Sequence, residues 1–447
     1  MSSGAAALTL GLLASLCVAQ ELPEHIVIVQ PRAVADAPPC PSEPRRVATA
    51  AADAPIPSPA PSNPALAEPT PMPEFKPGPG WPTPSATRPI RIAIWGDSHM
   101  ASGAFRTALA TEFESRGLTV QASIIPVNLT QPGIYLPIRA ACAPPSDWAL
   151  HSSYRSAEPL DVGLGLTALT STRRGSRLWL DLRDASGTRR YRELRIRYSP
   201  SDSPVHLTIG ADDSPARPIT LAPRRAGGAA LEEIVVRAST PLALLTVRVA
   251  DGILRVQGLM PASPGGPADV TLDSFGLPSA TFRGWSNAMP ATLRAALTGS
   301  GYDIALFAYG TNEGAAPDFD PVRYEADLRR SLRAVRDLLP AVACLMVGPP
   351  DRGVAPSLAL RATGDDPYFY ARRHAAIAGI QRRVAPEYGC ASWDWQWALG
   401  GPGSSYGMAR ASPALVQRDL THMTSAGYRR AAHELARFLG WTSAAAP

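Results

Sequence analysis

The sequence predicts a three-layer α/β/α domain with a parallel sheet, interrupted by an inserted all-β sandwich. Strand patterns alternate with helical patterns over residues 91–120 and again over 268–440, which is typical of a parallel sheet covered by helices on both faces. Residues 121–267 instead show short strand patterns separated by turn residues, as in a β-sandwich. With 447 residues, the chain is long enough for two such domains with tails.

The N-terminal residues 1–19 contain a short apolar run that is too short to span a bilayer. Cys17 and Ala19 fit a cleavage site before Gln20, so we expect a secretory signal and a periplasmic or secreted protein. The segment before the run is atypical because it has no Lys or Arg. A lipoprotein site at Cys17 is disfavoured, because Leu16 is a poor residue in front of it.

Residues 20–90 are rich in Pro and Ala. Such a tract buries too little apolar surface to offset its ordering entropy, so we expect a disordered linker. The apolar run at residues 25–29 is a weak candidate for an isolated strand.

The inserted segment alternates apolar and polar residues in several short stretches, and Pro, Gly, Asp and Ser fill the gaps between them. The expected strands are residues 162–170, 177–182, 194–198, 206–209, 234–237, 244–249 and 253–258. Sandwiches of this size often bind carbohydrate, but the fold class alone does not establish that function.

The α/β pattern resumes after the insert. Strands are expected at residues 91–95, 269–276, 303–310, 343–347 and 390–395, and helices at 105–113, 285–297, 322–338, 368–384 and 425–439. Residues 441–447 are expected to form a tail.

The composition is that of a globular protein, with 45% apolar and 18% charged residues. The net charge of +5 comes from scattered arginines, since Lys76 is the only lysine. The sequence has neither a stripe of basic residues nor a known nucleic-acid-binding motif, which argues against a nucleic-acid partner. At most, we expect weak attraction to polyanions such as cell-wall polymers.

Four cysteines remain beyond the signal: Cys40, Cys142, Cys344 and Cys390. None forms a Cys-x-x-Cys pair, so no metal site is expected. The apolar patterns around Cys344 and Cys390 favour small buried hydrophobic residues over a disulfide.

Three polar loops fit one mechanism. Ser98 follows an apolar strand and a glycine turn, where an exposed hydroxyl can act as a nucleophile if a base is near. In Asp419-Leu-Thr-His422, the Asp carboxylate can bind the imidazole Nδ1 and leave Nε2 free to accept the serine proton. Asn312 can donate to an oxyanion together with backbone N–H groups. Taken alone, Ser98 and Asp419 could equally cap helices.

These motifs occur in an order that resembles the SGNH/GDSL hydrolases. The branch most similar is that of the peptidoglycan O-acetylesterases, on the evidence of five segments: Gly-Asp-Ser-His at residues 96–99, Tyr-Gly-Thr-Asn-Glu at 309–313, Gly-Pro-Pro-Asp at 348–351, Gly-Gly-Pro-Gly-Ser at 400–404, and the inserted β domain. Any one motif is weak evidence, whereas five in order are strong.

The resemblance implies an SGNH-type (flavodoxin-like) fold with Ser98 as nucleophile, His422 as base and Asp419 orienting His422. It implies an oxyanion hole formed by Ser98 and Asn312 with a third donor. Where that branch carries a glycine as the third donor, this chain has Ser279, whose N–H can still donate. Gly276 is the alternative donor.

Asp97 and Glu313 are expected to support these loops. The resemblance further implies an esterase that releases O-acetyl groups from a polysaccharide such as peptidoglycan, without a metal or organic cofactor. Two alternatives remain open: a polysaccharide O-acetyltransferase that uses the same residues, and an inactive wall-binding protein.

Overall fold

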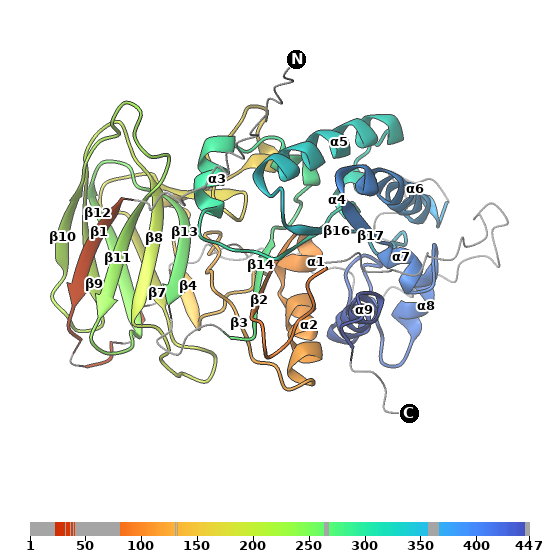
Figure 1. Ribbon diagram of the computed structural model, residues 1–447, viewed down its shortest axis with the longest axis horizontal. Coiled ribbons are helices and arrows are strands. Elements are labelled where there is room, and N and C mark those ends of the chain that lie inside the picture. The colour runs from red at the N-terminus through yellow and green to blue at the C-terminus, as the bar shows by residue number, and fades with distance from the viewer. Residues whose placement is uncertain are drawn as a thin grey trace, which may run out of the picture.

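The computed structural model describes residues 23–31, 33–35, 37–38, 40, 81–129, 131, 133–262, 268–355 and 366–442. Within these ranges the chain forms an α/β domain and a β domain (Figure 1). The expected signal and most of the expected linker lie outside the described residues. No helix of the described ranges combines the length and the apolar character needed to cross a bilayer.

The α/β domain is organised around a parallel sheet, which confirms the predicted fold class. Over the described residues the sheet has six strands, and every strand pair is parallel. In spatial order they are β17 (Cys390–Trp393), β16 (Ala343–Val347), β15 (Ile304–Ala308), β2 (Ile90–Gly96), β14 (Val270–Gly276) and β3 (Val120–Gln121). The carboxyl ends of β14, β2, β15 and β16 therefore meet at one edge, where open α/β sheets bind ligands.

Helices cover both faces of this sheet (Figure 1). One face packs against α2 (Ala104–Glu114), α8 (Ser404–Arg410) and α9 (Ser425–Phe438), and the other against α3 (Pro290–Leu297), α5 (Pro321–Leu338) and α6 (Phe369–Val384). Two of these helices, α5 and α9, begin at a side-chain cap. The Asp320 carboxylate accepts the N–H groups of Val322 and Arg323 at the start of α5.

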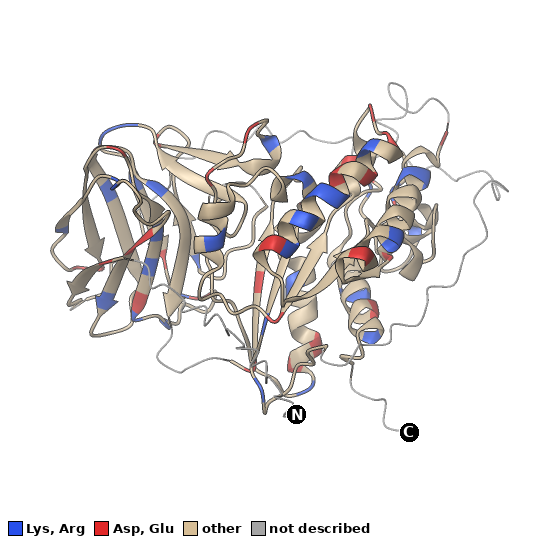
Figure 2. Ribbon diagram, turned by 45° about the horizontal axis from the view of Figure 1, so that its top comes forward, with Lys and Arg blue, Asp and Glu red and all other residues tan. Residues whose placement is uncertain are grey.

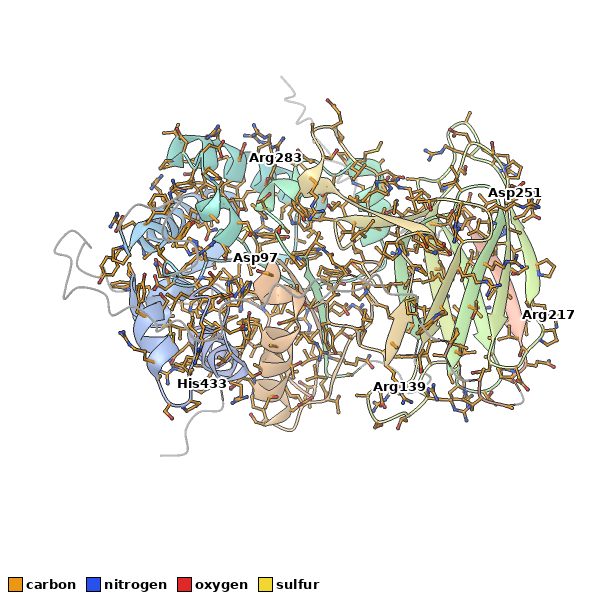
Figure 3. All side chains as sticks on the ribbon, turned by 180° about the vertical axis from the view of Figure 1, so that it is seen from behind. Asp97, Arg139, Arg217, Asp251, Arg283 and His433 are labelled. Carbon is orange, nitrogen blue, oxygen red and sulfur yellow. A yellow bond between two sulfur atoms is a disulfide. The ribbon has the colours of Figure 1, made fainter. Side chains whose placement is uncertain are left out.

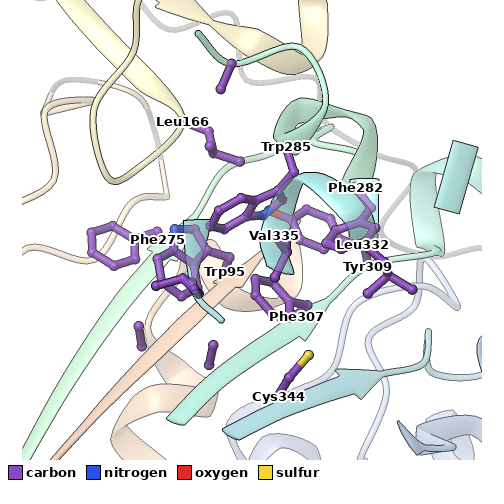
Figure 4. Close-up of a cluster of buried hydrophobic side chains, with 14 of the residues drawn as sticks. Trp95, Leu166, Phe275, Phe282, Trp285, Phe307, Tyr309, Leu332, Val335 and Cys344 are labelled. Carbon is purple, nitrogen blue, oxygen red and sulfur yellow. The ribbon is translucent and has the colours of Figure 1, made fainter. Parts of the chain in front are cut away.

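An aromatic cluster fills the space between the sheet and the second helical layer (Figure 4). Trp95 of β2 is completely buried, and its ring centroid lies 5.1–5.8 Å from those of its aromatic neighbours, Phe275, Trp285, Tyr302 and Phe307. Such offset and edge-on arrangements add to the stability that comes from burial alone. The cluster fixes the strands whose ends carry the polar loops.

The β domain is a sandwich of two sheets. One sheet contains β1 (Glu24–Val29), β11 (Glu232–Ala238), β8 (Glu193–Ser199), β13 (Arg255–Ala262), β6 (Thr167–Ser171) and β5 (Trp148–Ser152). The other contains β10 (Arg217–Leu221), β9 (Val205–Ala211), β12 (Leu244–Asp251), β7 (Arg177–Asp181) and β4 (Ala140–Cys142). Burial alternates along β8, with Leu194, Ile196 and Tyr198 pointing inward, as the period-2 pattern predicts.

The first sandwich strand comes from the segment expected to be linker, so that prediction was wrong for residues 24–29. Strand β1 pairs in parallel with β11, and Val27 and Val29 are buried in the sandwich core. The apolar run at residues 25–29 was only a weak candidate for an isolated strand, because the composition around it is typical of a linker. Strand pairing supplies the backbone partners that an isolated run would lack.

The two domains share a buried interface. Val162, Leu164 and Leu166 of the insert pack into the same cluster as Trp95, and the Trp95 Nε1–H donates to the Leu164 carbonyl at 2.6 Å. Because this contact is apolar and enclosed, the β domain is part of the framework of the α/β domain.

Two further boundaries differ from the sequence-based expectation. The helix expected over residues 285–297 is divided into a short 3-10 helix, η2 (Phe282–Trp285), and α3, because Pro290 can occupy only the first turn of a helix. Trp441, expected in the tail, is completely buried, and its carbonyl accepts from Arg116.

The cysteines form two disulfides, so the expectation of free buried thiols was wrong. Cys40 is bonded to Cys142 of β4, and Cys344 of β16 is bonded to Cys390 of β17. Residues 344 and 390 are direct partners in the parallel ladder, a register that local apolar patterns cannot reveal.

Charged residues are spread over both domains with the two signs interleaved (Figure 2). Many arginines form ion pairs with nearby carboxylates, as Arg195 and Arg197 do with Glu233. This distribution agrees with the expectation of a solvated basic surface.

The disulfide between β16 and β17 gives the first prediction. Replacing both Cys344 and Cys390 by Ala should lower the free energy of unfolding by roughly 2–4 kcal/mol, because the bond closes a long loop in the unfolded chain. Chemical denaturation under oxidising conditions measures the difference, and the Cys40→Ala, Cys142→Ala pair provides the comparison. Equal midpoints for the Cys344, Cys390 variant and the oxidised parent protein would contradict the assignment.

Candidate active site

The turn after β2 places Ser98 at the first residue of the short helix α1 (Ser98–Ala101). The Asp97 carboxylate caps this helix by accepting the His99 N–H at 2.9 Å. Gly96 is required here, since a Cβ at this position would lie 2.4 Å from the Met100 side chain and 2.8 Å from the Ala308 carbonyl. Ser98 is left half-buried with its hydroxyl available.

His422 lies next to Ser98, although 324 positions separate the two residues in the sequence. The Ser98 Oγ is 2.9 Å from the His422 Nε2, and the His422 Nδ1 is 2.6 Å from the Asp419 Oδ2. With Nδ1–H donating to Asp419, Nε2 is left to accept the proton of Ser98. The predicted nucleophile, base and orienting carboxylate therefore form a chain of two hydrogen bonds, from Ser98 to His422 and from His422 to Asp419.

The loop that carries Asp419 and His422 is held by its own backbone. The second Asp419 oxygen, Oδ1, accepts the N–H groups of Thr421 and His422 at 3.0 and 2.9 Å. Leu420 adopts a left-handed conformation with φ of 54°, and its carbonyl accepts the Gly353 N–H at 2.9 Å. Both oxygens of Asp419 are thus engaged within its own loop.

Asn312 lies on a one-turn helix, α4 (Thr311–Ala315), at the end of β15, where the sequence suggested a loop. One amide hydrogen of Asn312 is used, because Nδ2 donates to the Ala280 carbonyl at 2.8 Å. An amide carries two such hydrogens, so a second donor remains for an oxyanion. The neighbouring Glu313 accepts the Phe282 N–H at 2.8 Å, which ties α4 to the segment after β14.

Ser279 and Gly276 were alternative donors for the oxyanion hole, and the structure distinguishes them. Gly276 packs against α1 so closely that a Cβ would lie 2.1 Å from the Ala101 nitrogen. Ser279 is exposed and has a left-handed φ of 66°, a conformation that normally favours glycine. Its N–H has no acceptor among the described residues. Ser279 is therefore the better placed donor.

Asp351 follows β16 at the same sheet edge, but it is buried and fully occupied. It accepts from the Gln396 side chain at 2.8 Å and from the N–H groups of Gly403 and Ser405 at 3.0 and 2.8 Å. Asp351 thus anchors the loop at residues 400–404 and has no free oxygen for catalysis.

Figure 3 shows Asp97 inside the α/β domain beside α1, whereas Arg217 and Asp251 mark the far part of the β domain. The candidate site therefore belongs to the α/β domain, and Ser98, Asn312 and Ser279 follow the ends of three adjacent strands. An exposed hydroxyl with a hydrogen-bonded imidazole and a group of N–H donors suits acyl transfer.

Comparison with known proteins agrees with this arrangement. Residues 255–430 match the family model described as "GDSL-like Lipase/Acylhydrolase family". This match supports an SGNH-type esterase. No curated protein shows significant sequence similarity to this chain.

One solved structure shows the same fold as this chain. A structure titled "Peptidoglycan O-acetylesterase in action, 5 min" matches with a TM-score of 0.58 and 21% identity, covering 79% of this chain and 91% of that one. A family two carbohydrate esterase from Clostridium thermocellum, in complex with cellohexaose, matches with a TM-score of 0.26 and 11% identity, covering 66% and 99%.

The pKa values of the candidate catalytic residues follow from their contacts. The hydrogen bond from His422 to Asp419 raises the pKa of His422, and burial partly opposes this rise. Burial raises the pKa of Asp419, but the hydrogen bonds from the His422 ring and from two backbone N–H groups outweigh it and bring the pKa to about 2. Asp419 is therefore ionised throughout the neutral range.

Two buried carboxylates near the site have raised pKa values, in contrast to Asp419. Burial raises the pKa of Asp97 to about 6 and that of Glu313 to about 7, although backbone N–H groups donate to both. Their hydrogen bonds hold α1 and η2 in place, which agrees with the supporting function expected for them.

His99 is buried and does not reach Ser98. Its Nδ1 lies 3.2 Å from the Tyr428 hydroxyl, and burial holds its pKa well below the usual range. His99 therefore remains neutral and has a packing role beside the site.

The sequence analysis missed a contribution from the β domain. Tyr154, in the 3-10 helix η1 (Ser153–Arg155), donates its hydroxyl to the Pro278 carbonyl at 3.0 Å. The preceding Ser153 donates to the Gly284 carbonyl at 2.7 Å. The insert thus braces the turn that presents Ser279. No local motif signals this contact, because it depends on how the two domains pack.

The Asp419–His422 contact predicts the pH profile. Because only neutral His422 can accept the Ser98 proton and its pKa is raised, activity should fall on the acid side at a higher pH than an ordinary histidine would give. In Asp419→Asn the raising contact is lost, so the acid limb should move to lower pH while kcat/KM falls roughly 10²–10⁴-fold. A pH–rate profile with a soluble acetyl ester measures both effects. An acid limb at the same pH in both proteins would show that His422 is not the titrating base.

The second amide hydrogen of Asn312 gives a further prediction. Asn312→Ala should lower kcat by roughly 10²–10³-fold with little change in KM, because an oxyanion donor acts mainly in the transition state. Steady-state kinetics separates the two constants, and circular dichroism checks that the loss of the bond to Ala280 leaves the fold intact. A rise in KM alone would exclude the assignment.

Proposed function

We propose that this protein is a serine esterase that removes O-acetyl groups from a cell-wall polysaccharide, of which peptidoglycan is the best candidate. The observation that carries the proposal is the chain of contacts from Ser98 through His422 to Asp419, at a sheet edge that also presents Asn312 and Ser279. The coarser class, an SGNH-type esterase, is supported by the family match over residues 255–430.

The reaction proceeds in two halves. His422 takes the Ser98 proton as Oγ attacks the acetyl carbonyl, and the N–H groups of Ser98 and Ser279 with the Asn312 amide stabilise the tetrahedral oxyanion. The ester C–O bond then breaks, and His422 returns the proton to the leaving sugar hydroxyl. Water, deprotonated by His422, attacks the acetyl-serine and releases acetate and free Ser98.

A cavity of about 370 Å³ borders the candidate site at Asn312, which helps to line it, whereas Ser98 and His422 are not among its lining residues. The rings of Tyr154, Phe282 and Phe319 form part of its wall, and Asp320 and Arg323 lie among its polar residues. Concave sites with aromatic walls and a few polar groups are typical of ligand pockets. The solved structure of a peptidoglycan O-acetylesterase, which has the same fold, supports peptidoglycan as the polymer.

We further propose that the protein acts outside the cytoplasm, in the periplasm or after secretion. The apolar segment at residues 1–19 and the two disulfides support this location, since such bonds persist mainly in oxidising compartments.

The direct test is Ser98→Ala. This variant should release acetate from O-acetylated peptidoglycan at least about 10⁴-fold more slowly than the parent protein, because the nucleophile is lost. Ser115→Ala is the matched control, since Ser115 is an exposed serine whose hydroxyl only donates to the Glu112 carbonyl. The parent protein should prefer O-acetylated peptidoglycan to O-acetylated xylan.

Four results would contradict parts of this proposal. Acetate release by Ser98→Ala at the rate of the parent protein would exclude Ser98 as the nucleophile. Preference for xylan would exclude peptidoglycan as the main substrate. Acetyl transfer to an added glycan in preference to water would identify a transferase, and binding to wall material without any turnover would identify a binding protein.

A further inference from the structure

The cavity of about 370 Å³ beside the candidate site is lined by residues from both domains. Tyr154 of η1 comes from the β domain, and the remaining lining residues belong to η2, α4, the segment after α4 and the first turns of α5. Pockets of roughly 300 Å³ and more hold whole ring-sized ligands, whereas an acetyl group has only two carbons. The cavity is therefore much larger than the acetyl group alone requires.

Two of the lining residues also hold the turn that carries Ser279. The Tyr154 hydroxyl donates to the Pro278 carbonyl at 3.0 Å. Asn312 Nδ2 donates to the Ala280 carbonyl at 2.8 Å, and the same amide is a proposed oxyanion donor. The cavity thus begins where the proposed oxyanion hole ends, so a ligand bound in it would lie next to the attacked ester.

Another part of the wall, residues 316–320, is fixed by hydrogen bonds within the protein. The Ala316 carbonyl accepts the Phe319 N–H at 3.2 Å and the Arg373 guanidinium at 2.6 Å. The Asp320 carboxylate that follows caps α5. The Phe319 ring is half-buried and lines the cavity. Because this wall is already formed, little ordering entropy is lost when a ligand binds.

The chemistry of the lining suits a neutral sugar. Apart from Glu313, the charged lining residues are three carboxylates and two guanidiniums, all at least partly exposed: Asp318, Asp320, Asp327, Arg283 and Arg323. A hydrocarbon chain would remove water from these groups without replacing their hydrogen bonds. A polyanion would meet more negative charges than positive ones. Sugar hydroxyls both donate and accept, and the C–H groups of a sugar ring can pack against Tyr154 and Phe319.

We propose that this cavity binds a neutral sugar of the glycan chain, next to the sugar whose acetyl ester is attacked. This inference rests on the proposed function and specifies it further, because the enzyme would recognise a chain of sugars and not an isolated acetylated sugar. Through Tyr154, the β domain would form part of the binding site for the chain. Tyr154 and Phe319 bind the substrate in this proposal and transfer no proton.

The test measures binding without turnover. N-acetylglucosamine and its β-1,4-linked trimer carry no O-acetyl ester, so titration calorimetry can compare their dissociation constants for the parent protein. We expect the trimer to bind at least about tenfold more tightly, because only the trimer reaches from the catalytic residues into the cavity. Phe319→Ala should remove this preference. Tyr154→Phe keeps the ring and should retain it.

Phe369→Ala is the matched control. Phe369 is also half-buried and, like Phe319, lies beside the Arg373 guanidinium, but it does not line the cavity. This variant should bind the trimer as the parent protein does. Equal affinities of the parent protein for monomer and trimer, a preference that survives Phe319→Ala, or an equal loss in Phe369→Ala would each overturn the proposal. Displacement of the trimer by octanoate would overturn it as well, by assigning the cavity to an acyl chain.

A second measurement needs no variant and so does not depend on the folding of Phe319→Ala. In the parent protein with isotope-labelled Phe and Tyr, NOEs should connect the ring protons of the bound trimer with Phe319 and Tyr154. NOEs to aromatic residues outside the cavity alone would contradict the proposal. These outcomes are independent of esterase activity, which the Ser98→Ala comparison tests separately.

Discussion

The hydrogen bond between Ser98 and His422 is the contact on which the rest of the structure depends. It joins the first strand of the α/β domain to the loop before its last helix, and a β domain lies between them in the sequence. A nucleophile and base separated by even an additional ångström would lose much of their effect. The close packing at Gly96 and Gly276 and the Asp419 bonds to its own loop all serve to keep that distance at 2.9 Å.

The β domain contributes to this site more directly than an accessory module would. It shares a buried cluster with Trp95 on β2 and, through Tyr154, fixes the turn that carries Ser279. The strand β1 and the Cys40–Cys142 bond in turn attach the N-terminal segment to the sandwich. Part of the segment that reads as a tether is thus a structural component of the protein.

Local patterns in the sequence were sufficient for the fold class and for the loops that carry Ser98, Asn312 and His422. Strand and helix periods predicted the parallel sheet, and motif order placed the polar residues at its edge. Local patterns failed where long-range register decides the outcome. The Cys344–Cys390 bond depends on the pairing of β16 with β17, and the contact of Tyr154 with Pro278 depends on domain packing. The choice between Gly276 and Ser279 as the third oxyanion donor required the conformation of the turn that carries them.

Covalent labelling with a fluorophosphonate tests the central claim most directly, because such a probe reacts only with a serine activated by a nearby base. We predict one equivalent of label on the peptide that contains Ser98, as found by mass spectrometry after proteolysis, and much slower labelling in His422→Ala. Labelling of a different residue, or ester hydrolysis that continues while Ser98 remains unlabelled, would contradict the account.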